Sequence, residues 1–115
     1  MSADVREILL KVARKRSLIT YGELVNELGL PPMDGAWAAH PLSRIFEALD
    51  QEDATAQRPF RTTVVVKSGD LTPGGGYYEA LARLKGIKAL NAMHKLEVFM
   101  HELQALYALH TQEVT

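Results

Sequence analysis

A proline followed by three glycines, Pro73-Gly74-Gly75-Gly76, constrains what this chain can fold into more than any other feature. Glycine weakens the interior of helices and strands, and proline cannot donate to a strand ladder. The run therefore predicts a formed turn. Before it, residues 62–66 are β-branched, which is typical of a strand buried on at least one face. Ser68-Gly69-Asp70 would supply a turn and Leu71-Thr72 a return strand, so we expect a small β-hairpin.

Two helices are predicted near the start of the chain. Residues 3–16 repeat apolar side chains at the spacing of an amphipathic helix. Thr20 and Glu23 have the spacing of a capping box, so a second helix should start near Tyr21 and end at Gly29. The residues that follow, 32–39, are expected to be irregular.

A third helix is predicted over residues 41–53, because Pro41 suits a first helical turn and apolar residues recur at helical spacing. Its exposed side would carry Ser43, Arg44 and Glu47. We expect its acidic end to be solvated, at residues Asp50, Glu52 and Asp53.

After the glycine run, residues 78–84 should return to a helix that Gly86 ends, and a long helix should cover residues 88–111. The long helix has an apolar stripe that alternates spacings of three and four. Packing against its own domain and a dimer seam are equally compatible with this stripe. The seam would use Met93, Leu96, Met100, Leu103 and Tyr107.

Length and composition indicate one compact unit of 115 residues, with residues 1–86 as its main part and residues 87–115 as the added helix. The chain has no cysteine, which excludes thiol nucleophiles and disulfides. No window has the length of apolar sequence that a membrane span needs, and the N-terminal residues are charged. We therefore expect a cytoplasmic protein without a membrane partner.

Catalytic and cofactor chemistry has no recognisable residue set. His94 and His101 are two helical turns apart, too far for one metal ion, and position 105 is alanine where a zinc-protease motif needs histidine. The glycine run lacks the Lys-Ser/Thr of a phosphate loop. We predict a protein that is not an enzyme and that holds no metal or cofactor.

The expected order of elements, three helices followed by strand, wing and strand, is that of a winged helix. The fold class is thus α+β, mostly helical: a winged helix-turn-helix with a small β-hairpin and an additional long C-terminal helix. In such a fold the third helix can enter the major groove of double-stranded DNA and the wing can touch the backbone. Ser43 and Arg44 would lie on the reading surface, with Arg58, Arg61 and Lys67 near phosphates.

Several short motifs resemble one family. Thr20-Tyr21-Gly22-Glu23-Leu24, the helix from Ser43 to Leu49, Pro59 before a valine-rich strand, and Gly75-Gly76-Tyr77 together resemble the winged-helix DNA-binding domain of alkylguanine DNA alkyltransferases and alkyltransferase-like proteins. The likeness covers roughly residues 5–86. In that family the tyrosine helps to rotate a nucleotide from the duplex and an arginine of the third helix fills the gap, which would assign these roles to Tyr21 and Arg44.

The chain departs from that family at the reactive site. Where the family has Pro-Cys-His-Arg, this sequence has Pro59-Phe60-Arg61-Thr62, without the acceptor cysteine or its histidine. Alkyl transfer is therefore excluded. The bulky Phe60 is expected to fill the pocket.

Two functions are compatible with these observations. The first is a small non-catalytic DNA-binding protein, dimeric through its last helix, that acts in transcription regulation or as an accessory factor. The second is a protein-interaction module, such as a phage or mobile-element inhibitor of a host complex. The near-neutral net charge of −1 favours the second, as do aromatic residues suited to interface anchors: Trp37, Tyr77 and Tyr78.

Overall fold

The first three elements follow from local sequence signals, in a computed structural model that describes residues 2–32 and 35–112. Helix α1 (Ser2–Arg14) buries one apolar stripe, strand β1 (Ile19–Thr20) follows, and helix α2 (Tyr21–Leu28) starts where predicted. The Thr20 hydroxyl accepts from the Glu23 amide at 3.1 Å, and the Glu23 carboxylate accepts from the Thr20 amide at 2.9 Å. This capping box is confirmed, and Gly29 ends α2 with a φ of 67°.

A short 3₁₀ turn, η1 (Trp37–Ala39), leads into helix α3 (Pro41–Thr55), so the third predicted helix is confirmed. Residues 33 and 34 of the segment expected to be irregular lie outside the described residues. His40 caps α3: its Nδ1 accepts from the Leu42 amide at 3.0 Å, so its Nε2 carries the proton and donates to the Pro31 carbonyl at 2.8 Å. The start of α3 is thereby tied to the end of the α2 region.

The predicted β-hairpin is wrong. Residues Arg61–Val64 form a second 3₁₀ turn, η2, and only Val65–Val66 are extended, as strand β2. Strand β2 pairs in parallel with β1, with Ile19 opposite Val65 and Thr20 opposite Val66. Every residue of η2 and β2 is buried. Parallel strands are commonly covered on both faces, whereas a hairpin commonly keeps one face in water, so this burial explains why β2 pairs with β1 and not with a return strand.

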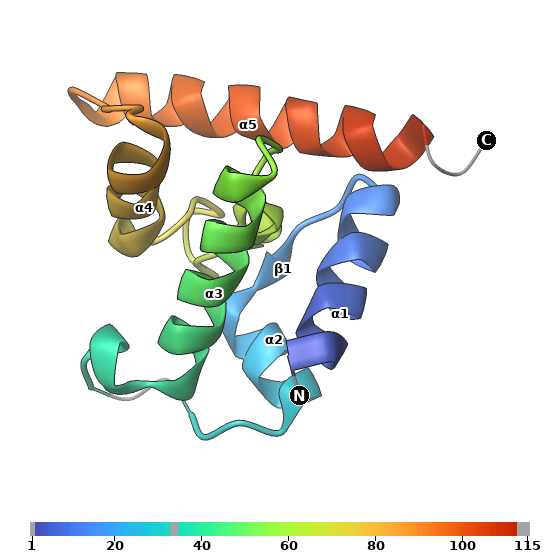
Figure 1. Cartoon of the computed structure of the whole chain (residues 1–115). Helices are drawn as coiled ribbons and strands as arrows, with labels where there is room; N and C mark the ends of the chain where they lie inside the picture. Colours follow the sequence, from blue (N-terminus) through green and yellow to red (C-terminus); the bar gives the residue numbers. More distant parts are fainter. Residues whose placement is uncertain (1, 33–34, 113–115) are drawn as a thin grey trace.

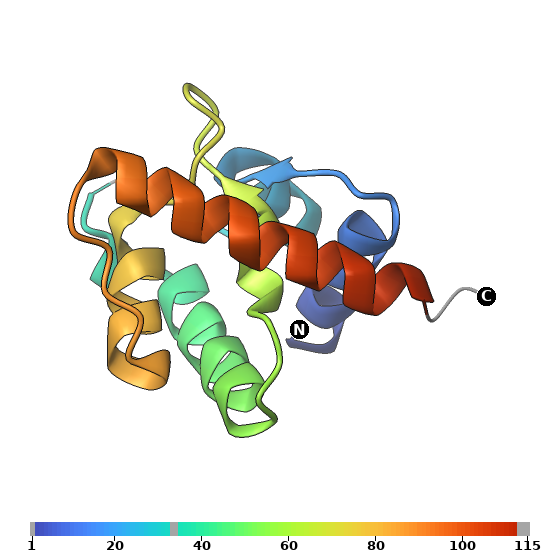
Figure 2. The ribbon, with the colours of Figure 1, turned by 90° about the horizontal axis from the view of Figure 1, so that it is seen from above.

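The residues after β2 form a loop instead of a return strand. The Lys67 amide donates to the Thr72 carbonyl at 2.8 Å, and the Leu71 amide donates to the Lys67 carbonyl at 3.0 Å. In Figure 2 this loop projects from the body of the molecule. Residues 67–72 therefore form a protruding loop without a strand ladder of their own.

Helix α4 (Gly75–Lys85) begins earlier than predicted, because Gly75 and Gly76 belong to its first turn. Only Gly74, the residue before the helix, stays extended. Gly86 ends α4 in the left-handed conformation with a φ of 70°, as expected.

Helix α5 (Ala92–Gln112) begins a few residues later than predicted and lies across one end of α1, α3 and α4 (Figures 1 and 2). It packs against α1 and η2, over a core built from residues of every helix except α4. A second, smaller cluster lies under α4 and contains Phe60, Tyr77, Ala80 and Leu81. The fold is thus mostly helical, with a two-stranded parallel sheet.

Candidate functional site

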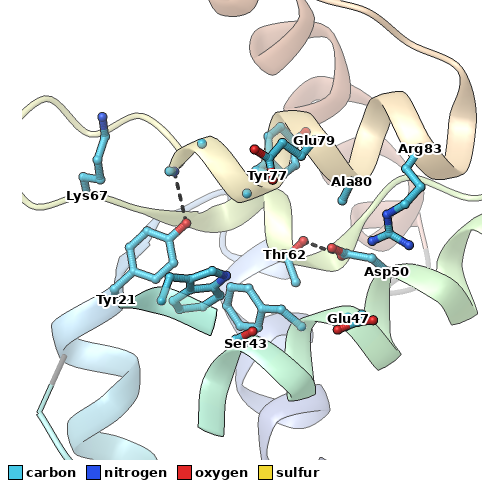
Figure 3. Close-up of a pocket in the computed structure, with 15 residues that line it drawn as sticks. Tyr21, Ser43, Glu47, Asp50, Thr62, Lys67, Tyr77, Glu79, Ala80 and Arg83 are labelled. Carbon is cyan, nitrogen blue, oxygen red and sulfur yellow. Dashed lines mark hydrogen bonds between the residues drawn. The ribbon is translucent and has the colours of Figure 1, made fainter. Parts of the chain in front are cut away.

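A cavity of about 440 Å³ lies between helix α3 and the first turns of helix α4 (Figure 3). Its wall also takes residues from α2, η1, η2 and the loop after β2. Ligand sites in proteins fall in this size range and combine apolar walls with a few placed polar groups. We call this cavity the α3–α4 pocket.

Aromatic rings form one wall of the α3–α4 pocket. Trp37 lies with its ring centroid 5.7 Å from that of Tyr21 and 5.6 Å from that of Phe46, both in edge-on geometry. Trp37 is only half-buried although it packs against the main core, so part of the indole faces the pocket. The wall therefore offers flat, polarisable surface to a ligand.

Close approach of the backbone explains why glycines occur here. The Gly74 amide donates to the Tyr21 hydroxyl at 3.1 Å, and a Cβ at Gly74 would come within 3.2 Å of that oxygen. A Cβ at Gly76 would come within 3.3 Å of Nε1 of Trp37. Burial raises the pKa of Tyr21 above its ordinary value. A phenol is protonated at neutral pH in any case, so this hydroxyl can donate one hydrogen bond while it accepts from Gly74.

Asp50 places a carboxyl group at the inner side of the pocket. The residue is 5% exposed, and its Oδ1 accepts from the Thr62 hydroxyl at 2.7 Å. Burial raises the pKa of Asp50 to about 7, although the hydrogen bond from Thr62 acts in the opposite direction. This carboxyl therefore changes charge near neutral pH.

The prediction that the acidic end of α3 is solvated was wrong for two of its three residues. Asp50 and Asp53 are buried and Glu52 is half-buried. Their positions follow the buried stripe of α3, which includes Phe46 and Leu49, at the spacing of one helical face. The helical spacing of Asp50 and Asp53 from the apolar residues of α3 therefore indicated that these two carboxyls are buried.

Asp53 is held in an ion-pair cluster with two of the predicted DNA contacts. Its carboxylate accepts from Nε of Arg61 at 3.0 Å, from the Arg61 amide at 2.8 Å and from Nε of Arg58 at 2.5 Å. Glu52 accepts from Arg61 at 2.9 Å and also pairs with Arg6. Arg61 is buried and its guanidinium is held by Asp53 and Glu52, so we leave it out of the candidate DNA surface. Arg58 is half-buried, and its contact with DNA stays a prediction.

The other predicted DNA residues come together. Tyr21, Ser43 and Lys67 all line the α3–α4 pocket, although they come from α2, α3 and the loop after β2. Arg44 is exposed on α3 beside Ser43. Phe60, at the position where the comparison family has its acceptor cysteine, is fully buried in the small cluster under α4 and is not among the residues that line the α3–α4 pocket.

The residues predicted to contact a protein partner differ in how far they are buried. Trp37 and Tyr78 are half-buried, whereas Tyr77 is buried with its hydroxyl 3.0 Å from that of Thr63. Along α5, Leu103 and Tyr107 belong to the main core. Met93, Leu96 and Met100 are exposed, and they are the part of the predicted seam that can meet another molecule.

Within the part of the chain that the structure describes, no group of three potential metal-ligating side chains is found. Among residues 2–32 and 35–112, no helix has the length and apolar character required to cross a membrane. Comparison of the chain with protein-family models, with curated proteins and with solved structures finds no match.

Proposed function

We propose that this chain is a small, non-catalytic DNA-binding protein of winged-helix form, acting as a regulator or accessory factor. The observation that carries the proposal is the meeting of Tyr21, Ser43 and Lys67 around one pocket, with Arg44 exposed beside it. These residues come from three separate elements. The sequence predicts a DNA contact for each of them.

The first turns of α3 supply the proposed reading surface. Arg44 and Glu47 are exposed and lie three residues apart, so they share one side of the helix. Arginine pairs with guanine O6 and N7, and glutamate accepts from cytosine N4. A helix that presents both groups has the chemistry for base contacts in the major groove.

The loop at residues 67–72 supplies the proposed wing. Lys67 is exposed and suits a phosphate contact, and Leu71 is exposed at the same projection. Proteins that reach the minor groove commonly combine basic side chains with an apolar one. Lys67 and the first turns of α3 border the same pocket, which supports the proposal that both contact one stretch of duplex.

Binding to a labelled random duplex across a salt series tests the proposal. Each phosphate contact should contribute about −0.9 to the slope of log affinity against log salt concentration. Arg44→Gln should weaken binding about tenfold. Lys67→Gln should weaken it and make the slope shallower by about 1.

Lys11→Gln is the matched control, because Lys11 is exposed on α1, whose last turn lies far from the start of α3 (Figure 1). It should leave the affinity nearly unchanged. Absence of binding at about 50 mM salt, or binding that salt does not weaken, would overturn the proposal.

A protein-interaction module is the second candidate, and one observation favours it. Four apolar side chains are exposed in the first half of α5 and just before it. They are Leu90 (81% exposed), Met93 (72%), Leu96 (51%) and Met100 (45%). Contiguous exposed apolar residues commonly mark a contact with another protein. Capture of a defined host complex that survives nuclease treatment and is lost in Leu96→Glu would favour this candidate over DNA binding.

A further inference from the structure

We propose that Arg83 is a gate of the α3–α4 pocket. When the Asp50 carboxyl is ionised, the Arg83 guanidinium moves inward and pairs with it, which joins α4 to α3 across the pocket. When that carboxyl is protonated, the guanidinium stays in solvent and the pocket remains open. The gate consists of two side chains of this chain, so the inference does not depend on DNA binding.

The carboxyl of Asp50 lies where an ionised group needs a partner. Asp50 is 5% exposed, and among the described residues its one hydrogen bond comes from the Thr62 hydroxyl, 2.7 Å from Oδ1. A buried carboxylate with a single neutral donor is unfavourable. Arg58 and Arg61 do not supply the missing charge, because both are bound to Asp53, about one turn along the same helix.

Arg83 is the basic side chain that can reach this carboxyl. In Figure 3 it extends from α4 toward Asp50, and both residues line the pocket. Arg83 is exposed and, within residues 2–32 and 35–112, makes no ion pair. Lys85, the other cation of α4 whose charge acts on Asp50, is already held. Its Nζ donates to the Arg58 carbonyl at 2.9 Å and lies 3.4 Å from Oε1 of Glu102.

The pair with Asp50 is favoured over the other acidic partners at the mouth of the pocket. Glu79 lies four residues before Arg83 on α4, and Glu47 lines the pocket from α3. Both are exposed, so a pair with either contributes little in water. A guanidinium binds a carboxylate through two parallel N–H donors, and at Asp50 this pair forms away from water, where the attraction is stronger.

The gate should close as the pH rises through 7. Burial raises the pKa of Asp50 to about 7, although the Thr62 hydrogen bond and the charge of Arg83 act in the opposite direction. Below this value the carboxyl is mostly protonated and does not attract the guanidinium. The titratable and charged groups around this carboxyl and its pocket come from four parts of the chain: Tyr21 from α2, Glu47 and Asp53 from α3, Lys67 from the loop, and Tyr77, Glu79, Arg83 and Lys85 from α4.

The first test uses the unchanged full chain. NMR titration between pH 5.5 and 8.5 follows the side-chain carboxyl carbon of Asp50 and the Nε and Cζ signals of Arg83. Both sets should change with one shared midpoint. Arg44 is the internal control, because it is exposed on α3 and does not line the pocket, so its signals should not follow that midpoint. Arg83 signals that stay constant while Asp50 titrates overturn the inference without any need for a variant to fold.

A double-mutant cycle of Asp50→Asn and Arg83→Gln is the second test, measured by urea unfolding at pH 5.5 and 8.5. Arg83→Gln should increase the equilibrium constant for unfolding about tenfold at pH 8.5, because it removes the charged donors of a buried carboxylate. In the Asp50→Asn background, and at pH 5.5 in either background, the effect should stay below about twofold. Contributions from histidines that titrate over this range cancel in the cycle.

Lys88→Gln is the matched control, because Lys88 is exposed just after α4 and does not line the pocket. It removes the same charge and should have an effect below about twofold at both pH values. An effect of Arg83→Gln that is equal at pH 5.5 and 8.5, or equal with and without the Asp50 carboxyl, overturns the gate. Since no nucleic acid is present, either result leaves the DNA-binding proposal as it stands.

Discussion

At the scale of single residues, Asp50 links the stability of the fold to pH. Its pKa is about 7 in the folded protein, against an ordinary value of 3.8, so the folded state binds this proton more tightly than the unfolded chain. The contribution of Asp50 to stability is therefore greatest at acid pH and is lost as the pH rises from about 4 through 7. The difference corresponds to about 4 kcal/mol.

Replacement of Asp50 by Asn should consequently stabilise the protein at pH 8, by up to about 4 kcal/mol. The amide keeps an acceptor for the Thr62 hydroxyl and no longer requires a buried charge. Urea unfolding followed by circular dichroism at pH 5, 6.5 and 8 measures the difference between variant and parent.

The difference should shrink steadily toward pH 5. Asp70→Asn serves as the control, because Asp70 is exposed and hydrogen bonds from Thr72 lower the pKa of its carboxyl instead of raising it. That variant should show no gain at high pH. A constant difference for Asp50→Asn at all three pH values would contradict the assignment.

At the scale of elements, the junction between β1 and α2 depends on the capping box. Thr20→Ala removes the acceptor for the Glu23 amide and should lower the free energy of unfolding by about 1 kcal/mol. Glu27→Gln, on an exposed position of the same helix, should change it by less than about 0.5 kcal/mol. Urea denaturation at pH 7 compares the two, and equal losses would contradict a specific role of the cap.

The helices could be predicted from sequence because their signals are local. The capping box at Thr20, proline at the start of α3 and glycine at the ends of α2 and α4 each act within a few residues. The pairing of β2 with β1 could not be predicted in this way, because the partner lies on the far side of α2 and α3 in the sequence. The same limit applies to the pocket, because its residues come from elements that are distant in the sequence and meet only in the folded chain, as in the packing of η2 and α4 on α3.

Burial along α5 could be predicted only in part. The apolar stripe identified the helix, but it did not distinguish the half that packs on α1 and η2 from the half that stays exposed. Phe99 and Leu106, which widen the apolar stripe of the sequence, are buried together with Leu103 and Tyr107. The spacing therefore identifies the face of the helix, but it does not show where along the helix that face is covered.

A matched pair on α5 tests this division. Leu103→Ala removes a buried side chain from the main core and should lower the free energy of unfolding by about 3 kcal/mol. Leu96→Ala makes the same change at an exposed position of the same helix and should cost less than about 0.5 kcal/mol. Chemical denaturation measures both, and similar losses would show that the start of α5 is also covered.

At the scale of the whole molecule, the ion-pair cluster around Asp53 joins segments that are distant in sequence. Arg6 from α1, Glu52 and Asp53 from α3, and Arg61 from η2 are connected side chain to side chain. Asp53 is fully buried, so its charge depends on these partners. The cluster fixes α3 relative to α1 and η2, and it thereby positions the pocket wall that α3 and η2 share.

Replacing an arginine inside this cluster should therefore lower stability without weakening DNA binding, and replacing an exposed arginine outside it should do the reverse. Arg61→Met removes the buried one of the two arginines that pair with the buried Asp53 carboxylate and should lower the free energy of unfolding by about 3–5 kcal/mol. Arg44→Met, on the exposed side of α3, should change stability by less than about 0.5 kcal/mol. Duplex binding, measured at a temperature where both variants are folded, should weaken for Arg44→Met and stay near the parent value for Arg61→Met. Loss of binding in folded Arg61→Met, with stability unchanged, would instead place Arg61 at the DNA surface and require the α3–η2 junction to open.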